Sequence, residues 1–169
     1  MAFCEIAVEE YSVAAVRLFL RDKLLLTAED AAGHTNAMTV SWGGIGVFWG
    51  KPVLFYGIRP ERYTYGFAES GRRVSLTAFP QEMADVLTYC GTHSGRDGDK
   101  CAEAGITPIC MPDGTPGYAE ASLVITVRKC YRHAITPEEL LVGELHSFYT
   151  KGGYHTLYIA EIEHIYRKE

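Results

Sequence analysis

The chain has 169 residues and a formal net charge of -5, and 47% of its residues are hydrophobic. This composition is ordinary for a soluble globular protein, and the length suits a single domain over residues 1–169. The negative charge argues against a protein that binds nucleic-acid polymers, because phosphate backbones need a broad basic surface. A local basic cluster can still bind one phosphate group.

The cysteines predict a reducing environment. There are five, an odd number, and none forms a Cys-x-x-Cys pair, so we expect free thiols in the cytoplasm rather than a disulfide framework. The chain begins MAFCEIAVEE, with acidic residues where a signal peptide carries basic ones, so we expect no such peptide. The apolar stretches are too short to span a membrane, and we expect no membrane partner.

The first half of the chain predicts one short helix and three strands. Val13, Val16 and Leu20 recur at helical spacing, which predicts an amphipathic helix over residues 12–21. Apolar, β-branched runs predict strands at 24–27, 36–42 and 53–58. The last of these is apolar on both faces, which predicts burial by the core on one side and by a partner on the other.

The second half of the chain predicts three further strands and one helix. Residues 74–79 alternate as a half-buried strand does, and longer strands are expected over 123–128 and 156–166. One helix face is expected to contain Met83, Val86, Leu87 and Cys90. Because strands dominate, helices are short and no βαβ repeat occurs, the pattern predicts a mainly β protein, an antiparallel barrel with short flanking helices.

The first candidate site is NAMTVSW at residues 36–42, which Gly43 and Gly44 follow. Thr39 and Ser41 lie two apart, so both hydroxyls face one side of a strand and can hold a phosphate or the polar edge of a ring. The glycines allow a bend or a close approach of backbone. A strand with a solvated polar face explains the same pattern.

The second candidate is the segment RPERYT. Arg59 and Arg62 flank Pro60 near an expected helix start, where arginine forks and helix amides together bind phosphate oxygens. Thr64 adds a hydroxyl. The alternative is a solvated helix start in which Glu61 pairs with an arginine.

The third candidate is the loop CGTHSGRDGDK, which ends at Lys100. Cys90, His93, Asp97 and Cys101 suggest metal ligands, but their spacing fits no zinc or calcium pattern and Lys100 would repel a cation. We therefore expect no metal. The loop does not match a phosphate-binding GxxxxGK[ST] motif either, and a polar surface loop is the plain alternative.

The fourth candidate is Gly152-Gly153-Tyr154-His155, directly before the last strand. A histidine after two glycines is open to whatever approaches the turn, although a surface histidine is the simpler interpretation. No Ser/His/Asp or Cys/His arrangement points to a hydrolase.

Together these segments resemble the flavin reductase-like family, which includes the flavoredoxins. The matching stretches are NAMTVSWGG, KPVLFYGIRPERYT, CGTHSGRDGDK, ITP at 106–108 and GYHTLYIAEI, and in order they cover most of residues 23–166. The resemblance implies a Greek-key split barrel of the FMN-binding type. It also implies a homodimer, with the flavin near the dimer interface.

The resemblance further implies which residues hold FMN. The strand expected along the isoalloxazine ring and ribityl chain contains Met38, Thr39, Val40, Ser41 and Trp42. The residues expected at the phosphate end are Arg59, Arg62, Tyr63 and Thr64, and those expected near the ring are Ser94, Arg96 and Lys100. A cation beside the ring would stabilise the reduced flavin. Hydride transfer needs no protein nucleophile or general acid, so no residue is assigned as certainly catalytic.

Two departures from the family pattern leave the electron donor open. Cys101 stands where an aromatic residue commonly follows Asp-Lys, and Tyr154 replaces the aspartate of a Gly-Asp-His turn that is tied to nicotinamide use. His155 is a candidate for seating NADH or NADPH, whereas Tyr154 can stack on an aromatic ring or partly block the pocket.

Three functions follow from the resemblance. The first is an FMN-dependent oxidoreductase that takes electrons from NAD(P)H or a protein donor. The alternative is a non-enzymatic, flavoredoxin-like electron carrier with a redox protein partner. The third is a ligand-binding module without turnover.

Overall fold

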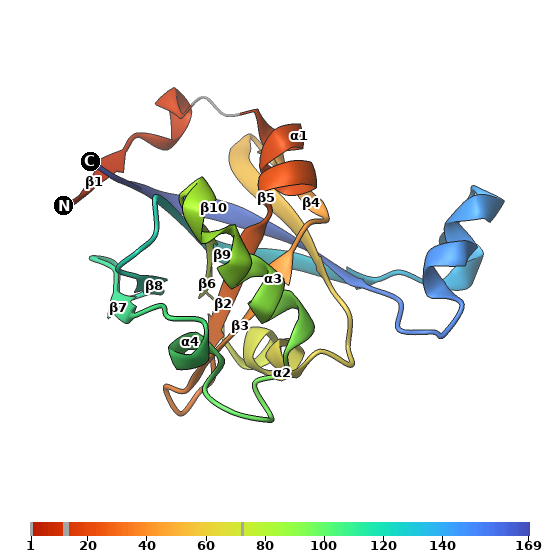
Figure 1. Cartoon of the computed structure of the whole chain (residues 1–169). Coiled ribbons are helices and arrows are strands. Elements are labelled where there is room, and N and C mark those ends of the chain that lie inside the picture. The colour runs from red at the N-terminus through yellow and green to blue at the C-terminus, as the bar shows by residue number, and fades with distance from the viewer. Residues whose placement is uncertain (1, 12–13, 72) are drawn as a thin grey trace.

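The computed structural model describes residues 2–11, 14–71 and 73–169. Its main sheet has eight antiparallel strands in the order β3-β2-β6-β9-β10-β5-β4, with β1 paired to β10 (Figure 1). The strand bounds are Phe3–Ile6 (β1), Leu24–Glu29 (β2), Thr35–Val40 (β3), Gly43–Phe48 (β4), Lys51–Ile58 (β5), Arg73–Ala78 (β6), Leu123–Ala134 (β9) and Thr156–Lys168 (β10). A separate hairpin pairs β7 (Pro108–Cys110) with β8 (Pro116–Tyr118).

The sheet closes on itself where its two edge strands are joined. β3 and β4 lie at opposite ends of the strand order, yet only Ser41 and Trp42 separate them in sequence. The Cα atoms of residues 40 and 43 can be at most about 11 Å apart, so the sheet has to curl until its edges approach. In the described residues β3 and β4 are not paired, so the barrel is split at this point. The predicted mainly β, antiparallel fold with short helices is confirmed.

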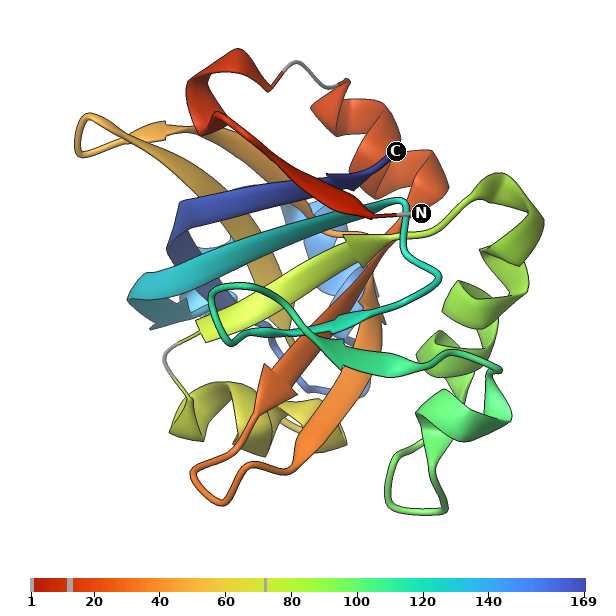
Figure 2. The same ribbon diagram turned by 90° about the vertical axis from the view of Figure 1, so that its left-hand side faces the viewer.

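Short helices surround the barrel. Their bounds are Ala15–Arg17 (α1, continued by a π-helical turn at Leu18–Asp22), Tyr63–Ser70 (α2), Ala84–Thr92 (α3) and Lys100–Glu103 (α4), with 3₁₀ turns at Val8–Glu10, Gln81–Met83, Pro137–Glu139 and Gly143–Tyr149. Figure 2 shows α3 and α4 along one side of the barrel and α2 at one end. None of the described helices is long and apolar enough to cross a membrane.

The strands bury both of their faces, which gives the molecule two hydrophobic clusters. Leu24 and Leu26 point into the barrel with residues from the other strands, while Leu25 between them lies under α3. The predicted face of α3 is confirmed, because Val86, Leu87 and Cys90 are all buried in that outer cluster and Met83 packs against it.

The N-terminal helix buries residues other than those predicted. Val16 and Leu20 are 77% and 70% exposed, whereas Leu18 and Phe19 are buried. The regular spacing fails because the helix has only three residues before it widens into the π-helical turn, which puts sequence neighbours on the same face. Val13 lies outside the described residues.

The glycines after Trp42 belong to a strand, β4, that the sequence did not predict. A Cβ atom at Gly43 would lie 2.2 Å from the carbonyl oxygen of Phe55 and 2.5 Å from the ring of Phe19. The close backbone approach predicted for these glycines is thus found at Gly43, between strands β4 and β5, whereas a Cβ at Gly44 would meet nothing within 4 Å.

Strand β5 is buried within the chain itself. It runs between β4 and β10, and Val53, Leu54, Tyr56 and Ile58 are fully buried there. Phe55 and Gly57 of the same strand are only half-buried, so cover by a partner on that side stays a prediction.

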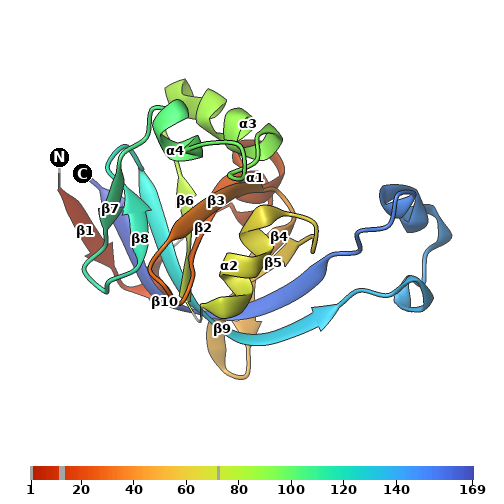
Figure 3. The same cartoon turned by 90° about the horizontal axis from the view of Figure 1, so that it is seen from below.

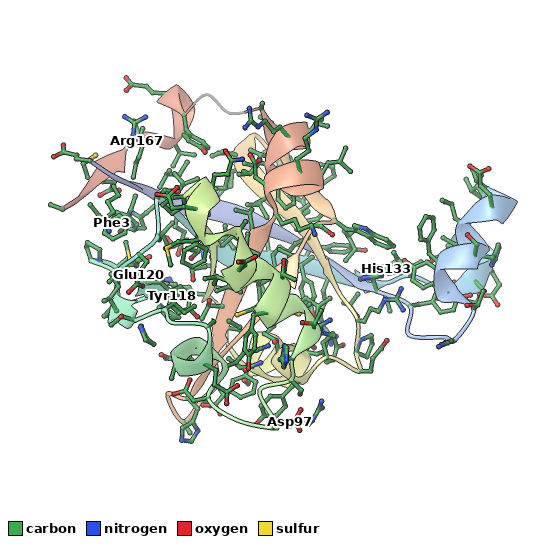
Figure 4. All side chains as sticks on the ribbon, in the orientation of Figure 1. Phe3, Asp97, Tyr118, Glu120, His133 and Arg167 are labelled. Atoms are coloured by element: carbon green, nitrogen blue, oxygen red, sulfur yellow. The ribbon has the colours of Figure 1, made fainter. Side chains whose placement is uncertain are left out.

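Beyond the barrel, β9 and β10 lead into and out of an arm formed by residues 135–155, which projects from the body (Figures 1 and 3). Figure 4 labels His133 where β9 approaches the arm; its Nε2 lies 3.0 Å from the Glu139 carboxylate. Thr136 and Glu139 form a capping box, so local hydrogen bonds start the first turn of the arm. Leu141 and Phe148 of the arm are 95% and 53% exposed.

Candidate functional site

Two adjacent pockets open beside the split in the barrel, and both are lined by Arg62. The first, about 170 Å³, is lined by Met38, Thr39, Val40, Ser41, Trp42, Gly57, Arg59, Arg62 and His155. The second, about 220 Å³, is lined by Glu61, Arg62, Tyr63, Thr64, Gly91, Thr92, His93, Ser94, Gly95, Arg96 and Lys100. Every residue that the sequence assigned to FMN, and His155 as well, lines one of these two pockets.

Strand β3 forms one wall of the first pocket. Met38 and Val40 are 6% and 3% exposed and belong to the barrel core. The Thr39 hydroxyl donates to the carbonyl oxygen of Leu87 in α3, so it ties the strand to the helix. Because β3 is an edge strand, its outer backbone groups are not paired within the sheet and can meet a ligand.

The second pocket gathers positive charge. Lys100 is only 5% exposed, and its ammonium donates to the carbonyl oxygens of Cys90 (3.3 Å) and His93 (3.2 Å) at the end of α3. Arg62 donates to the carbonyl oxygen of Gly91 at 3.2 Å. Burial lowers the pKa of both side chains. Among the residues that the structure describes, no carboxylate forms an ion pair with Arg62 or Lys100.

Further polar groups complete the second pocket. Arg96 lies over the ring of Tyr63, with its guanidinium carbon 4.8 Å from the ring centre. Asp99 caps α4 by accepting from the amides of Cys101 and Ala102, which orients the turn that carries Lys100.

Asn36 is a residue of this site that the sequence did not single out. Its side-chain amide donates to the Thr64 hydroxyl at 2.7 Å, which leaves the Thr64 hydrogen free to donate to a ligand. A Cβ at position 95 would lie 2.1 Å from the Asn36 amide oxygen, so only glycine fits there. Asn36 opens the NAMTVSW segment and Gly95 lies in the loop, but a single sequence cannot show that they meet.

Arg59 differs from the other cations, because it connects the barrel to the arm. Its guanidinium donates to the carbonyl oxygen of Phe148 at 2.8 Å, lies 5.3 Å from the centre of the Tyr149 ring, and is 3.8 Å from Glu61. These contacts come from the arm and from a neighbouring carboxylate. Arg59, which lines the first pocket, therefore already has partners within the chain. Arg62 and Lys100 line the second pocket.

His155 lies at the base of the arm, among aromatic rings. Its ring centre is 4.6 Å from that of Trp42, and its Nδ1 is 3.0 Å from the Tyr149 hydroxyl. Tyr154 stacks on Tyr149 with ring centres 4.4 Å apart. Burial, reinforced by the charge of Arg59, lowers the pKa of His155 to about 4, so its imidazole is neutral near pH 7.

The turn before His155 requires its two glycines. Gly152 and Gly153 have φ angles of +74° and +69°, which L side chains rarely adopt. A Cβ at Gly153 would also lie 2.1 Å from the carboxylate of Glu61. The turn therefore lies directly against Glu61 of the RPERYT segment, and His155, which follows it, lines the first pocket.

The described residues contain no cluster of three or more potential metal ligands.

No curated protein matches the sequence. Solved structures do match its fold: an FMN-binding domain of a flavin reductase-like enzyme from Shewanella baltica OS155 has a TM-score of 0.70 at 17% identity, over 98% of this chain and 77% of that one.

Two other solved structures are similar. The flavoredoxin of Desulfovibrio vulgaris (Miyazaki F) has a TM-score of 0.69 at 20% identity, over 97% of this chain and 78% of that one. The styrene monooxygenase flavin reductase from Pseudomonas putida S12 has a TM-score of 0.66 at 16% identity, over 91% of this chain and 84% of that one. The model of the flavin reductase-like domain family matches residues 17–169, and the chain belongs to that family.

Proposed function

We propose that the chain, as one domain of residues 1–169, binds FMN and passes electrons through it. The observation that carries this proposal is the second pocket, where the buried Lys100 and the half-buried Arg62 form no ion pair among the described residues, although Glu61 also lines the pocket. Uncompensated buried cations are costly, and an anionic ligand removes that cost. A phosphate monoester is the anion that such a corner of arginine, lysine and hydroxyl groups suits best.

The two pockets together suit one elongated ligand. Each alone is smaller than the ~300 Å³ of an ordinary small-molecule site. In the proposed arrangement the phosphate lies in the second pocket and the ring extends along β3 in the first. This differs from what the resemblance implied: Ser94, Arg96 and Lys100, expected near the ring, line the pocket proposed for the phosphate, and Arg59, expected at the phosphate end, lines the pocket proposed for the ring. There the free backbone edge of β3 offers hydrogen bonds, and Trp42 offers an aromatic wall. When bound, the flavin supplies the redox chemistry, and the protein binds and orients it.

The preference for the phosphate tests this proposal. Fluorescence quenching titrations of the apoprotein are expected to show FMN binding at least tenfold more tightly than riboflavin, because a charge-assisted hydrogen bond contributes about 1.5–3 kcal/mol. Riboflavin shares the ring and the ribityl chain, so it is a matched control. Equal affinities for the two flavins would reject the assignment of the second pocket.

We further propose that NADH or NADPH is the electron donor, which makes the protein an NAD(P)H:flavin oxidoreductase. His155 supports this, because its neutral ring lines the first pocket and can hydrogen-bond a nicotinamide nucleotide. Anaerobic stopped-flow mixing of the FMN-loaded protein with NAD(P)H is expected to bleach the flavin. His155→Ala is expected to slow that bleaching with little change in FMN affinity, since its role is to position the donor.

A flavoredoxin-like electron carrier is the second candidate. It is favoured by Tyr154, which stacks on Tyr149 where many family members have an aspartate. If NAD(P)H fails to bleach the bound flavin of the wild type, while dithionite does, the donor is a redox protein instead. Bleaching by NAD(P)H at a rate that saturates with concentration would exclude the carrier function as the sole activity.

We also propose that the protein is a homodimer in a reducing, cytoplasmic setting. Large apolar side chains are exposed on the π-helical turn after α1, on the β4–β5 turn and on the arm, among them Leu20, Trp49 and Leu141. Such surfaces are typical of interfaces. Sedimentation at micromolar concentration is expected to give twice the mass of the chain, and a monomer that binds FMN tightly would contradict the dimer. Thiol titration of the unfolded protein is expected to find five free cysteines.

A further inference from the structure

We infer that Tyr149 is a positioning residue, whose hydroxyl donates to Nδ1 of His155 and thereby presents the Nε2–H of that histidine to the ligand in the first pocket. This inference rests on the proposed function in one respect only, namely the identity of the ligand that receives the hydrogen bond. The arrangement of the two side chains stands on geometry alone.

The geometry confines His155 on several sides. The Tyr149 hydroxyl lies 3.0 Å from Nδ1, and the Trp42 ring lies against the imidazole at 4.6 Å between centres. A Cβ at Gly57 would lie only 3.2 Å from the ring, so the imidazole rests on bare backbone of β5. With Nδ1 engaged by Tyr149, Nε2 is the ring nitrogen that is left for a ligand in the pocket.

Tyr149 is itself held in place. It is 8% exposed, stacks on Tyr154 at an interplanar angle of 15°, and lies under the Arg59 guanidinium. Arg59 also binds the neighbouring carbonyl of Phe148. Tyr149 and His155 both belong to the arm, and Arg59 follows β5, so these contacts tie the arm to the barrel beside the site.

The direction of the hydrogen bond follows from the two groups. A phenol is a stronger donor than a neutral imidazole N–H, and an imidazole nitrogen is a stronger acceptor than a phenol oxygen. Burial raises the pKa of the Tyr149 hydroxyl, and the charge of Arg59 opposes that shift. The hydroxyl therefore stays protonated near pH 7, and its hydrogen is available to Nδ1 at 3.0 Å. The imidazole then carries its single proton on Nε2.

A neutral Nε2–H donor has a definite chemical use. It can bind a carbonyl oxygen, such as one on a flavin ring or a nicotinamide carboxamide, without adding a positive charge to the pocket. Arg59 already supplies a cation there, and its charge opposes protonation of the ring. Tyr149 therefore acts through His155 on where a ligand sits, rather than on the reacting atoms.

Nitrogen NMR of the histidine ring tests the contact directly. In the FMN-loaded wild type, long-range ¹H–¹⁵N spectra near pH 7 are expected to show His155 with a proton on Nε2 and an Nδ1 that accepts a hydrogen bond; a His155→Gln spectrum assigns the signals. Tyr149→Phe is expected to shift Nδ1 toward the value of an unbonded ring nitrogen. Tyr154→Phe is the matched control: it removes a hydroxyl from the same stack, and its Nδ1 signal is expected to stay in place.

Kinetics test the consequence. Tyr149→Phe keeps the ring, so its FMN affinity is expected to stay within about twofold of wild type while the KM for NAD(P)H rises about fivefold. A merely structural role would not separate these two constants.

A wild-type His155 protonated on Nδ1, or an Nδ1 signal that Tyr149→Phe leaves unchanged, overturns the inference. An unchanged KM in a protein that NAD(P)H does reduce overturns it as well. If NAD(P)H reduces neither form, the proposed reductase function fails, and the NMR result alone then decides the role of Tyr149.

Discussion

The second pocket and the strands β5, β6, β9 and β10 both gather positive charge, but only the strands pair it with negative charge. Along the strands a ladder of five charged side chains runs Lys51–Glu161–Arg128–Glu163–Arg73, with ion-pair contacts of 2.7 Å from Lys51 to Glu161 and 2.8 Å from Arg73 to Glu163. In the second pocket, Lys100 and Arg62 bind only backbone carbonyl oxygens.

The difference separates a structural use of charge from a functional one. The cationic side chains of the ladder are 42–50% exposed, and Glu161 and Glu163 neutralise their charge within the fold. They therefore need no bound anion. Lys100 is 5% exposed, and burial lowers the pKa of its ammonium group, which means that the fold disfavours the charge. A fold keeps such a group when a bound anion compensates it, and three predictions test whether that distinction holds.

Replacing Lys100 is expected to give the largest effect. Lys100→Met keeps the length of the side chain but removes the charge, so FMN affinity is expected to fall by about 10- to 150-fold, the equivalent of one charge-assisted hydrogen bond. Riboflavin affinity is expected to change by less than about twofold, because riboflavin has no phosphate. Titration of both flavins against both proteins measures the two effects.

Lys51→Met is the matched control, since it removes the same charge from the ladder. Its FMN affinity is expected to equal that of the wild type. If both variants weaken FMN equally, the effect is one of overall charge and the contrast between the two regions fails. Circular dichroism of the apo forms establishes that each variant is folded.

As the pH falls, protonation of His155 in the site is expected to lower the free energy of unfolding at a higher pH than protonation of the ladder carboxylates does. The folded-state pKa of His155 is about 4 against about 6.5 for an ordinary histidine, so between these values the unfolded chain binds more protons than the folded one. The free energy of unfolding therefore falls as the pH drops from about 6.5 to about 4, by on the order of 1–2 kcal/mol after allowance for partial solvent screening. Glu161, whose pKa is lowered chiefly by Lys51, responds only at lower pH.

Urea unfolding at several pH values compares the wild type with His155→Gln. The variant lacks the titrating group, so its stability is expected to depend less on pH within that window. An equally steep loss in both proteins would assign the acid sensitivity to some other group.

Much of the fold could be predicted from the sequence where one physical pattern dominates. Alternation located β6 and the first half of β9, apolar runs located β2 and β5, and the spacing of Val86, Leu87 and Cys90 located the buried face of α3. The pattern failed for β4, because its glycines resemble a bend until Phe55 and Phe19 are seen against Gly43. It also failed at Val16 and Leu20, because a π-helical turn shifts the helical register.

The candidate site could be predicted as a set of segments, but not as a set of contacts. Each segment was recognisable from its own residues together with the family resemblance. Three pairings were not: Asn36 with Thr64, Arg59 with the arm, and Tyr149 with His155. The first two join residues far apart in sequence. The third joins residues of the arm, which has no regular periodicity to reveal it.

The smallest expected effect comes from breaking the ladder. Glu163 accepts from both Arg73 and Arg128, so Glu163→Gln weakens two ion pairs while it keeps the shape of the side chain. Both arginines are about half exposed, and solvent screening limits what such pairs contribute. We therefore expect the melting temperature to fall by about 2 °C or less, and by less still in high salt. FMN affinity is expected to stay unchanged, because charge paired within the fold takes no part in holding a ligand. A loss of FMN affinity in Glu163→Gln comparable to that in Lys100→Met would show that the two charged regions act as one.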